Sequence, residues 1–238
     1  MRLLVVNCNT NVEMTTIIAQ NARAAARAGT EIIGVQPSWG PESAEGFYES
    51  FVTAAAVLDT LARYPDPFDA VVMAGFGEHG REGVRQLLDV PVVDITEAAA
   101  QMACLLSYRF GVVTTMSSAI GGIHESLASM GLSDRCAGIR AADVPVSSIH
   151  YSPDVVDRLA EVGQRLLDDG ADALVLGCAG FAGLDERLQE ILHVPVIDGV
   201  AAAVVWAEGI IHLGKTTSKF GYFAAADTTK TWIGWPKG

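Results

Sequence analysis

The sequence has few basic residues and no long hydrophobic run, and each shortage excludes a class of protein. Its 238 residues contain 16 Lys and Arg against 28 Asp and Glu, so the net charge is −12. Nucleic-acid backbones select basic surfaces, and an anionic membrane surface does not attract an acidic chain. No apolar stretch approaches the roughly 20 residues of a membrane span. We therefore expect neither a nucleic-acid nor a membrane partner.

Cysteine is also scarce, and the number and spacing of the four cysteines exclude further classes of protein. Cys8, Cys104, Cys136 and Cys178 are too few for a disulfide scaffold in a chain of this size. They show no CxxC or Cys/His ligand spacing, and no GxGxxG or Walker-type loop is present. We therefore expect no metal and no nucleotide cofactor. The N-terminal apolar run is too short for a signal peptide, which predicts a cytoplasmic protein.

Hydrophobic residues make up half of the chain, and their pattern predicts a parallel α/β fold. Short Val/Ile/Leu-rich runs alternate with longer Ala-rich amphipathic segments, which is typical of buried parallel strands covered by helices on both faces. The expected strands are 3–7, 31–36, 70–74, 91–94, 110–114, 138–141, 173–177 and 195–198. The expected helices are 14–28, 47–63, 83–88, 96–106, 118–130, 153–169, 185–192 and 200–213.

The sequence repeats itself once. DAVVMAGFG at 69–77 aligns with DALVLGCAG at 172–180, and VPVVD at 90–94 aligns with VPVID at 194–198. A third, weaker match in the same order joins RLLVVNCNT to RFGVVTTMS. The repeat predicts two tandem, pseudo-symmetric flavodoxin-like domains with parallel sheets and a cleft between them. The expected division is 1–98 plus 205–238 for the first domain and 99–204 for the second.

Ligands of open α/β sheets bind beyond the carboxyl ends of the strands, so strand-end loops of both domains should surround the cleft. One of these loops carries Cys178, directly after an expected strand and before a small-residue turn. Backbone amides and a helix dipole at that place favour a thiolate. The competing interpretation is a small buried apolar cysteine.

Several motifs in the same order resemble the hydantoin and allantoin racemases of the aspartate/glutamate racemase superfamily. The resemblance runs from about Arg2 to about Lys219. It implies a mechanism without a cofactor, in which two cysteines on opposite faces of a carbon acid remove and return a proton. The motifs are NxNT (Asn7, Asn9, Thr10), FGxxG (Phe76, Gly77, Gly80), VPVVDITEAA, RFGVVTT and LGCAGF.

The chain departs from this family at the first cysteine, where it has Gly75. Three explanations stay open. Another group serves the vacant face: Glu78, Cys8 (where the family usually has proline) or His79, whose ordinary pKa suits proton transfer best. Alternatively, the enzyme protonates from one face only, as the related arylmalonate decarboxylases do with one cysteine and a partner glycine. Otherwise Gly75 is an introduced substitution. A solvent-facing loop histidine is the competing interpretation of His79.

The other expected site residues offer hydrogen bonds to a carboxylate or an imide carbonyl. Amides at strand ends and helix starts bind anions, although Asn, Thr and Gly there also serve turns and caps. We expect Cys178 and His79 to be catalytic. The expected substrate-binding residues are Asn9, Thr10, Gly75, Phe76, Gly77, Thr114, Thr115, Ala179 and Gly180.

These observations predict a cofactor-independent acid/base enzyme, a racemase or isomerase, acting on a small cyclic ureide or carboxylate. A one-thiol decarboxylase or isomerase is the first alternative. A non-catalytic small-molecule binding protein, which has kept the cleft and lost the chemistry, is the second. We also expect a homo-oligomer.

Overall fold

The computed structural model describes residues 1–151, 154–227, 229–231 and 233. The described residues form two four-stranded parallel sheets, with strand orders β2-β1-β3-β4 and β6-β5-β7-β8. The predicted α/β class with two pseudo-symmetric parallel sheets is confirmed. The first sheet contains β1 (Arg2–Asn7), β2 (Glu31–Val35), β3 (Ala70–Ala74) and β4 (Val92–Asp94). The second contains β5 (Phe110–Thr114), β6 (Cys136–Ala141), β7 (Ala173–Leu176) and β8 (Val196–Asp198).

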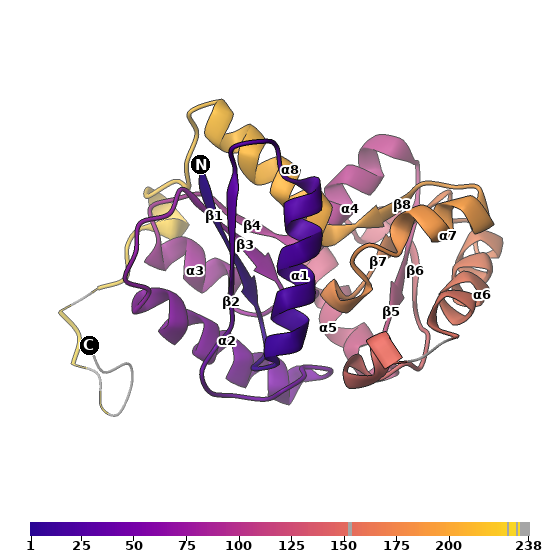
Figure 1. The fold of residues 1–238 in the computed structure, drawn as a ribbon, viewed down its shortest axis with the longest axis horizontal. Coiled ribbons are helices and arrows are strands. Elements are labelled where there is room, and N and C mark those ends of the chain that lie inside the picture. Colours follow the sequence, from indigo (N-terminus) through magenta and orange to yellow (C-terminus); the bar gives the residue numbers. More distant parts are fainter. Residues whose placement is uncertain (152–153, 228, 232, 234–238) are drawn as a thin grey trace.

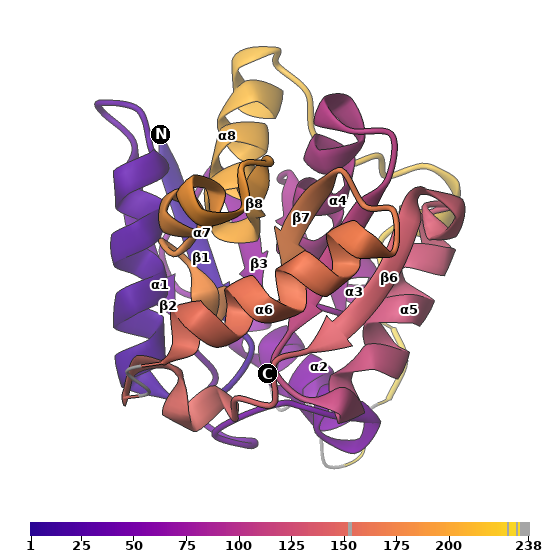
Figure 2. The same ribbon diagram turned by 90° about the vertical axis from the view of Figure 1, so that its right-hand side faces the viewer.

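The helices form an inner layer between the sheets and two outer layers (Figure 1). The inner layer holds α1 (Val12–Ala25), α4 (Ile95–Leu106), α5 (Ile120–Ser129) and α8 (Gly199–His212). The outer face of the first sheet carries α2 (Phe47–Ala62) and α3 (Arg81–Leu87). In Figure 2 the outer face of the second sheet is covered by α6 (Val155–Asp168) and α7 (Asp185–Leu192).

The inner layer explains why the central strands are apolar along their whole length. Side chains alternate across a strand, so Leu3 and Val5 face the inner helices while Leu4 and Val6 face α2 and α3. All four are at most 1% exposed. Strands that are buried on both faces need such continuous hydrophobic runs.

The repeated aspartates of VPVVD and VPVID are helix caps. The Asp94 carboxylate accepts hydrogen bonds from the backbone of Thr96 and Glu97, and so begins α4 directly after β4. In the same way Asp198 accepts the Val200 N–H and begins α8 after β8. A side-chain acceptor at this position satisfies helix amides that have no partner in the helix.

The helix α8 packs on α4 and also on α1, β3 and β4 of the first sheet. Beyond it, the hydroxyl groups of Thr216 and Thr217 donate to the Asp89 and Val90 carbonyls, which places the tail along the first half. The exact domain division stays a prediction. Within the described residues, no helix has the length and hydrophobicity to cross a membrane.

Candidate active site

The carboxyl ends of β1, β3, β5 and β7 meet at a small pocket between the two halves. Its lining comes from residues 7–9 after β1, 74–76 and 79 after β3, 114–115 after β5, and 177–179 after β7. The free volume is about 30 Å³. That is room for a water molecule or two and not for a five-membered ring.

The strand register places two pairs of residues level with each other at this pocket. The β1–β3 ladder ends with Asn7 opposite Ala74, so the next residues, Cys8 and Gly75, stand side by side. Continuing the β5–β7 ladder past its last pair, Val113 and Leu176, brings Thr115 level with Cys178. One strand of each central pair therefore carries a cysteine, on β1 in the first half and on β7 in the second.

Cys178 lies where the sequence predicts, at the end of β7 in the pocket. Its Sγ accepts the Gly180 N–H at 3.3 Å. Burial nevertheless raises the thiol pKa to about 11, because it outweighs the backbone N–H groups of Gly180 and Phe181. The prediction of a thiolate at a helix start is therefore wrong for this structure. The turn after Cys178 is a three-residue 3-10 helix, Ala179–Phe181, too short to have an appreciable dipole.

Cys8 lines the same pocket. Burial raises its thiol pKa to about 12, and negative charge on Cys178 is the second contribution to that rise. Ionising one of the two thiols therefore makes ionisation of the other harder. Two-sided proton transfer needs this state, in which one cysteine is a thiolate and the other keeps its proton.

His79 is only 4% exposed, so the interpretation as a solvent-facing loop histidine is wrong. Its Nε2 lies 3.3 Å from the Phe76 carbonyl oxygen, to which it can only donate, and burial lowers the ring pKa. Nδ1 of the neutral ring is then an acceptor, and it has no hydrogen-bond partner among the described residues. A catalytic role for His79 stays a prediction.

The structure brings six of the expected binding residues into the pocket: Asn9, Gly75, Phe76, Thr114, Thr115 and Ala179. Thr10 lies outside its lining, because the Thr10 backbone N–H and hydroxyl both bond to the Pro41 carbonyl. Gly180 uses its amide to hold the Cys178 sulfur. The Gly77 amide donates to the Thr96 hydroxyl at 2.8 Å, so it is not available to an anion.

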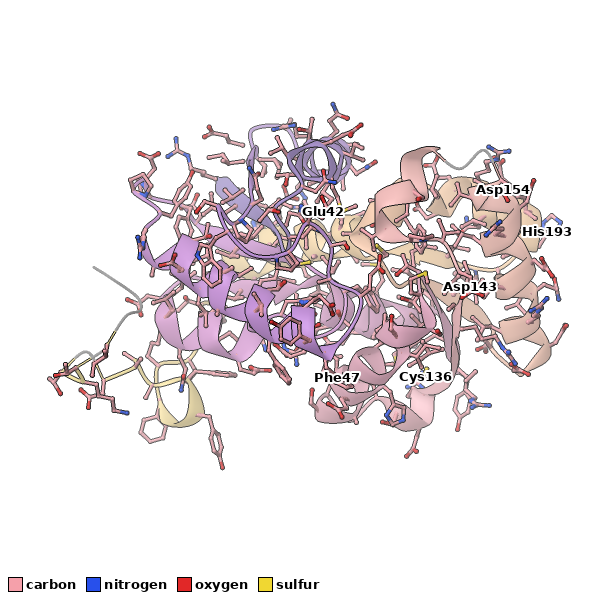
Figure 3. All side chains as sticks on the ribbon, turned by 90° about the horizontal axis from the view of Figure 1, so that it is seen from below. Glu42, Phe47, Cys136, Asp143, Asp154 and His193 are labelled. Carbon is pink, nitrogen blue, oxygen red and sulfur yellow. The ribbon has the colours of Figure 1, made fainter. Side chains whose placement is uncertain are left out.

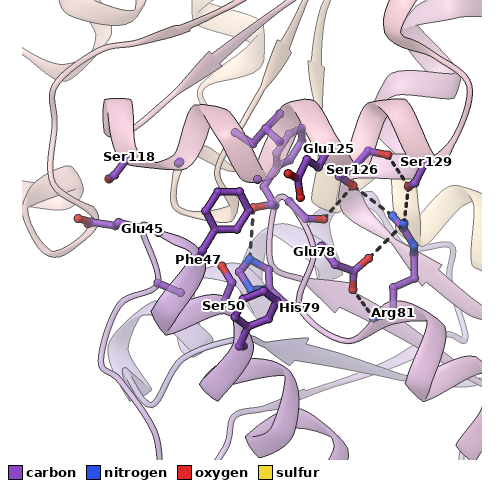
Figure 4. A pocket seen from close by; sticks show the side chains of 18 of the residues that line it. Glu45, Phe47, Ser50, Glu78, His79, Arg81, Ser118, Glu125, Ser126 and Ser129 are labelled. Carbon is purple, nitrogen blue, oxygen red and sulfur yellow. Dashed lines mark hydrogen bonds and ion pairs between the residues drawn. The ribbon is translucent and has the colours of Figure 1, made fainter.

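A larger chamber of about 270 Å³ adjoins this pocket, and the sequence analysis missed it. The two spaces share Ala44, Phe76, His79 and Ala119 as walls. Beyond this shared wall the chamber is lined by the start of α2, by residues 76–82 and by α5 (Figure 4). Figure 3 shows Phe47 of α2 on the lower face, where its ring lies against α5. The sequence feature that indicates this chamber is the glycine pair Gly121 and Gly122. A Cβ at Gly121 would lie 3.2 Å from the Phe47 ring, so glycine leaves room for that ring.

Arg81 is the buried charge of the chamber wall, with only 1% of its surface exposed. Its guanidinium pairs with Glu82 at 2.8 Å, Glu78 at 3.2 Å and Asp94 at 3.6 Å. The serine hydroxyls of α5 accept its remaining hydrogen bonds. Its charge is thus neutralised within the protein. Among the described residues no three His, Cys, Asp or Glu side chains gather as a metal site would require.

Comparisons with known proteins agree with this geometry. A model of the family described as Asp/Glu/Hydantoin racemase matches residues 3–207. A hydantoin racemase from Pseudomonas sp. (strain NS671) is 36% identical over 222 residues, which cover 92% of this chain and 89% of that protein. The structure of allantoin racemase from Pseudomonas fluorescens superimposes with a TM-score of 0.95 at 46% identity, over 98% of this chain and 100% of that one. For allantoin racemase from Klebsiella pneumoniae the TM-score is 0.94 at 37% identity, over 98% and 97% of the two chains. The chain therefore belongs to the Asp/Glu/Hydantoin racemase family, and it is an enzyme of the racemase class, as its motifs predict.

Proposed function

We propose that the protein racemises a small cyclic ureide, with the Cys178 thiol as one of the groups that move the proton. The observation that carries the proposal is the place of Cys178, at the end of β7 in a pocket that strand ends of both halves surround. The family and its relatives named as hydantoin and allantoin racemases support a hydantoin-type ring as substrate.

The proposed reaction needs a base, an acid and stabilisation of negative charge. A Cys178 thiolate takes the proton from the chiral carbon, and the electron pair of that C–H bond moves onto the adjacent ring carbonyl as an enolate. Asn9 and Thr115 line the pocket with amide and hydroxyl groups. Donors that are fixed before the charge develops stabilise such an intermediate strongly. Return of a proton to the opposite face gives the other enantiomer.

The charges around the site favour a neutral ring over a free carboxylate. None of the described residues that line the pocket is Lys or Arg. Arg81, the basic residue among those lining the chamber, is already paired with Glu78 and Glu82. Glu45 and Glu125 add further negative charge to the chamber wall. A carboxylate substrate would be repelled there, which favours the cyclic ureide of the two predicted substrate classes.

The chamber is the proposed place of the substituent on the chiral carbon. Apolar rings of Phe47, Phe51 and Phe76 line it together with the carboxylates. Such a surface accepts an aromatic ring or a group rich in N–H donors. An anionic substituent, such as carboxymethyl, should therefore be a poor substrate.

The test is deuterium exchange with enantiopure 5-substituted hydantoins in D2O, followed by optical rotation and by NMR of the α-proton. The wild-type protein should convert each enantiomer into the racemate with deuterium in both products. Cys178→Ala should abolish this conversion. Cys136→Ser should leave it unchanged, because Cys136 lies at the start of β6 and outside the pocket lining. Absence of racemisation by the wild type across aromatic and ureido substituents would count against the proposal.

Gly75 favours a second candidate, a one-thiol decarboxylase, although its malonate substrate would meet the same repulsion from Glu45 and Glu125. Such an enzyme would release CO2 from a disubstituted malonate and protonate the enediolate on one face through Cys178. Incubation with an arylmalonate in D2O separates the two functions, because decarboxylation places deuterium on one face only. Ligand binding without turnover, in the wild type and in Cys178→Ala alike, would instead indicate a binding protein.

A further inference from the structure

We infer that Cys8 is the second catalytic thiol, which reaches from the end of β1 into the space that Gly75 leaves open and serves the substrate face opposite Cys178. This inference rests on the proposed racemase function and names the group that completes it. Three observations carry it: the strand register, the space around Gly75 and the coupling of the two thiols.

The register makes such a relocation possible. Neighbouring parallel strands lie about 4.8 Å apart, so a side chain at the end of one strand can occupy space above the end of the next. Cys8 follows Asn7, and Gly75 follows Ala74, its partner in the β1–β3 ladder. A thiol on either strand therefore reaches the same part of the pocket.

The space around Gly75 shows that the two positions exclude each other. A Cβ built on Gly75 would lie 2.7 Å from the Cys8 Cβ and 3.0 Å from its Sγ. The first distance is shorter than real contacts between such atoms. A cysteine at both positions would overlap in this backbone geometry. Glycine at 75 is thus the residue that leaves room for the Cys8 thiol.

Electrostatics support the assignment. Burial contributes most to the raised pKa of Cys8, the charge of Cys178 comes next, and the charge of Asp94 contributes less. Two further titratable groups lie nearby: burial lowers the pKa of the His79 ring, and Glu45 contributes to the raised pKa of Cys178. Cys8 is therefore a thiol in the same pocket whose pKa rises when Cys178 is ionised.

His79 is the other side chain that borders the space above Gly75. Its ring also packs against Gly75, where a Cβ would meet the His79 Cδ2 at 2.5 Å. Buried acceptors are almost always hydrogen-bonded, yet Nδ1 has no partner among the described residues. Nδ1 lies across the ring from Cδ2, the atom that contacts Gly75, so it does not face the space above Gly75.

The proton transfers balance without any further reactant. The Cys178 thiolate breaks the C–H bond and becomes a thiol, while the electron pair enters the ring as an enolate. The Cys8 thiol then gives its proton to the opposite face, forms the new C–H bond and becomes a thiolate. The enzyme is left with its proton on the other sulfur, ready for the reverse reaction or for exchange with water.

The experiment compares Cys8→Ala, Cys8→Ser, Cys178→Ala and the control Cys136→Ser on each enantiomer in D2O. Racemisation should fall at least about 100-fold in Cys8→Ala and in Cys8→Ser, because a positioned acid or base contributes roughly 10²–10⁴-fold. Each single-thiol enzyme should still exchange the α-proton of one enantiomer with retention. Cys8→Ala and Cys178→Ala should exchange opposite enantiomers, a pattern that a merely structural cysteine cannot produce.

Circular dichroism and melting temperature verify that the variants are folded. Serine nearly keeps the size of the cysteine side chain, so a loss of activity in Cys8→Ser is not caused by a cavity. Racemisation near the wild-type rate in both Cys8 variants would overturn the role of Cys8 and leave the proposed function standing. Exchange of the same enantiomer by Cys8→Ala and Cys178→Ala would overturn it as well. A wild-type protein that racemises no hydantoin would overturn both proposals.

Discussion

The chemistry of the Cys8 and Cys178 thiols depends strongly on their surroundings. Burial raises their pKa values to about 12 and about 11, from an ordinary value of 9.0. Both side chains are therefore thiols near neutral pH. Since the proposed base is a thiolate, only a small fraction of the enzyme is in the reactive form at pH 7.

The first prediction is a rise of activity with pH. The thiolate fraction increases about tenfold per pH unit below the thiol pKa, so kcat/KM for hydantoin racemisation should rise by about 100-fold between pH 7 and pH 9. Because the pKa values are raised rather than lowered, the increase should continue beyond pH 9. A pH–rate profile on the wild type checks this, with buffers matched in ionic strength. A flat profile across that range would show that substrate binding has already lowered the thiol pKa.

The second prediction concerns Gly75. Gly75→Ala should lower the free energy of unfolding by about 1–3 kcal/mol, because the new methyl group overlaps Cys8 and His79. In a Cys8→Gly background the same change should cost less, by at least about 0.5 kcal/mol, since residues in contact are not additive. Urea unfolding of the four proteins measures this coupling. Equal costs in both backgrounds would mean that His79 alone excludes a side chain at this position.

Sequence reasoning located Cys178, the vacancy at Gly75 and half of the described residues that line the pocket. It could not give the direction of the thiol pKa shifts, because these follow from burial between two sheets, which no local pattern encodes. The same limit applies to Thr10, whose motif is at the pocket but whose hydroxyl turns to Pro41, 31 residues away. His79 looked exposed for the same reason, since it lies in a polar loop.

At the scale of elements, the aspartates of the repeated VPVVD and VPVID segments each end a strand and cap the helix that follows. Asp198 ends β8, caps α8 and also accepts the Gly183 N–H at 3.1 Å. One carboxylate therefore connects the start of α8 to the loop that follows Cys178 and its 3-10 turn. The expected strand bounds came from hydrophobic runs and agree with the structure to within one or two residues. The 3-10 turn was not predicted, because the small residues Ala179 and Gly180 fit many turn types.

The third prediction tests this connection. Asp198→Ala should lower the free energy of unfolding by about 1–2 kcal/mol, because the Val200 and Gly183 amides lose their acceptor. Asp198→Asn keeps one of the two acceptor oxygens, because the Val200 N–H bonds to Oδ1 and the Gly183 N–H to Oδ2, and should cost about half as much. Urea unfolding with circular dichroism compares the two variants. If asparagine is as costly as alanine, one acceptor oxygen is not enough and the stabilisation needs the whole carboxylate.

At the scale of the whole molecule, the two sheets share one hydrophobic core. Val5 and Val72 of the first sheet and Val112 and Val175 of the second belong to a single cluster of buried side chains, filled by the inner helices. The pseudo-symmetry was visible in the sequence, whereas the shared core was not, because inner and outer apolar residues look alike along a buried strand. The active-site pocket lies where these halves meet, so its geometry depends on their packing.

The fourth prediction is that the halves unfold together and that α8 controls this unfolding. A Cβ on Gly199, at the start of α8, would lie 2.9 Å from the backbone oxygen of Ile95 in α4. Gly199→Ala should therefore force the two helices apart and lower the free energy of unfolding by about 1–3 kcal/mol. Gly209→Ala on the same helix has open space around its Cβ and should be neutral or stabilising by up to about 1 kcal/mol. Circular dichroism and tryptophan fluorescence should give coincident urea transitions in both variants, since neither half keeps a complete core without the other. Two separate transitions, or equal costs at Gly199 and Gly209, would contradict a core held together across α4 and α8.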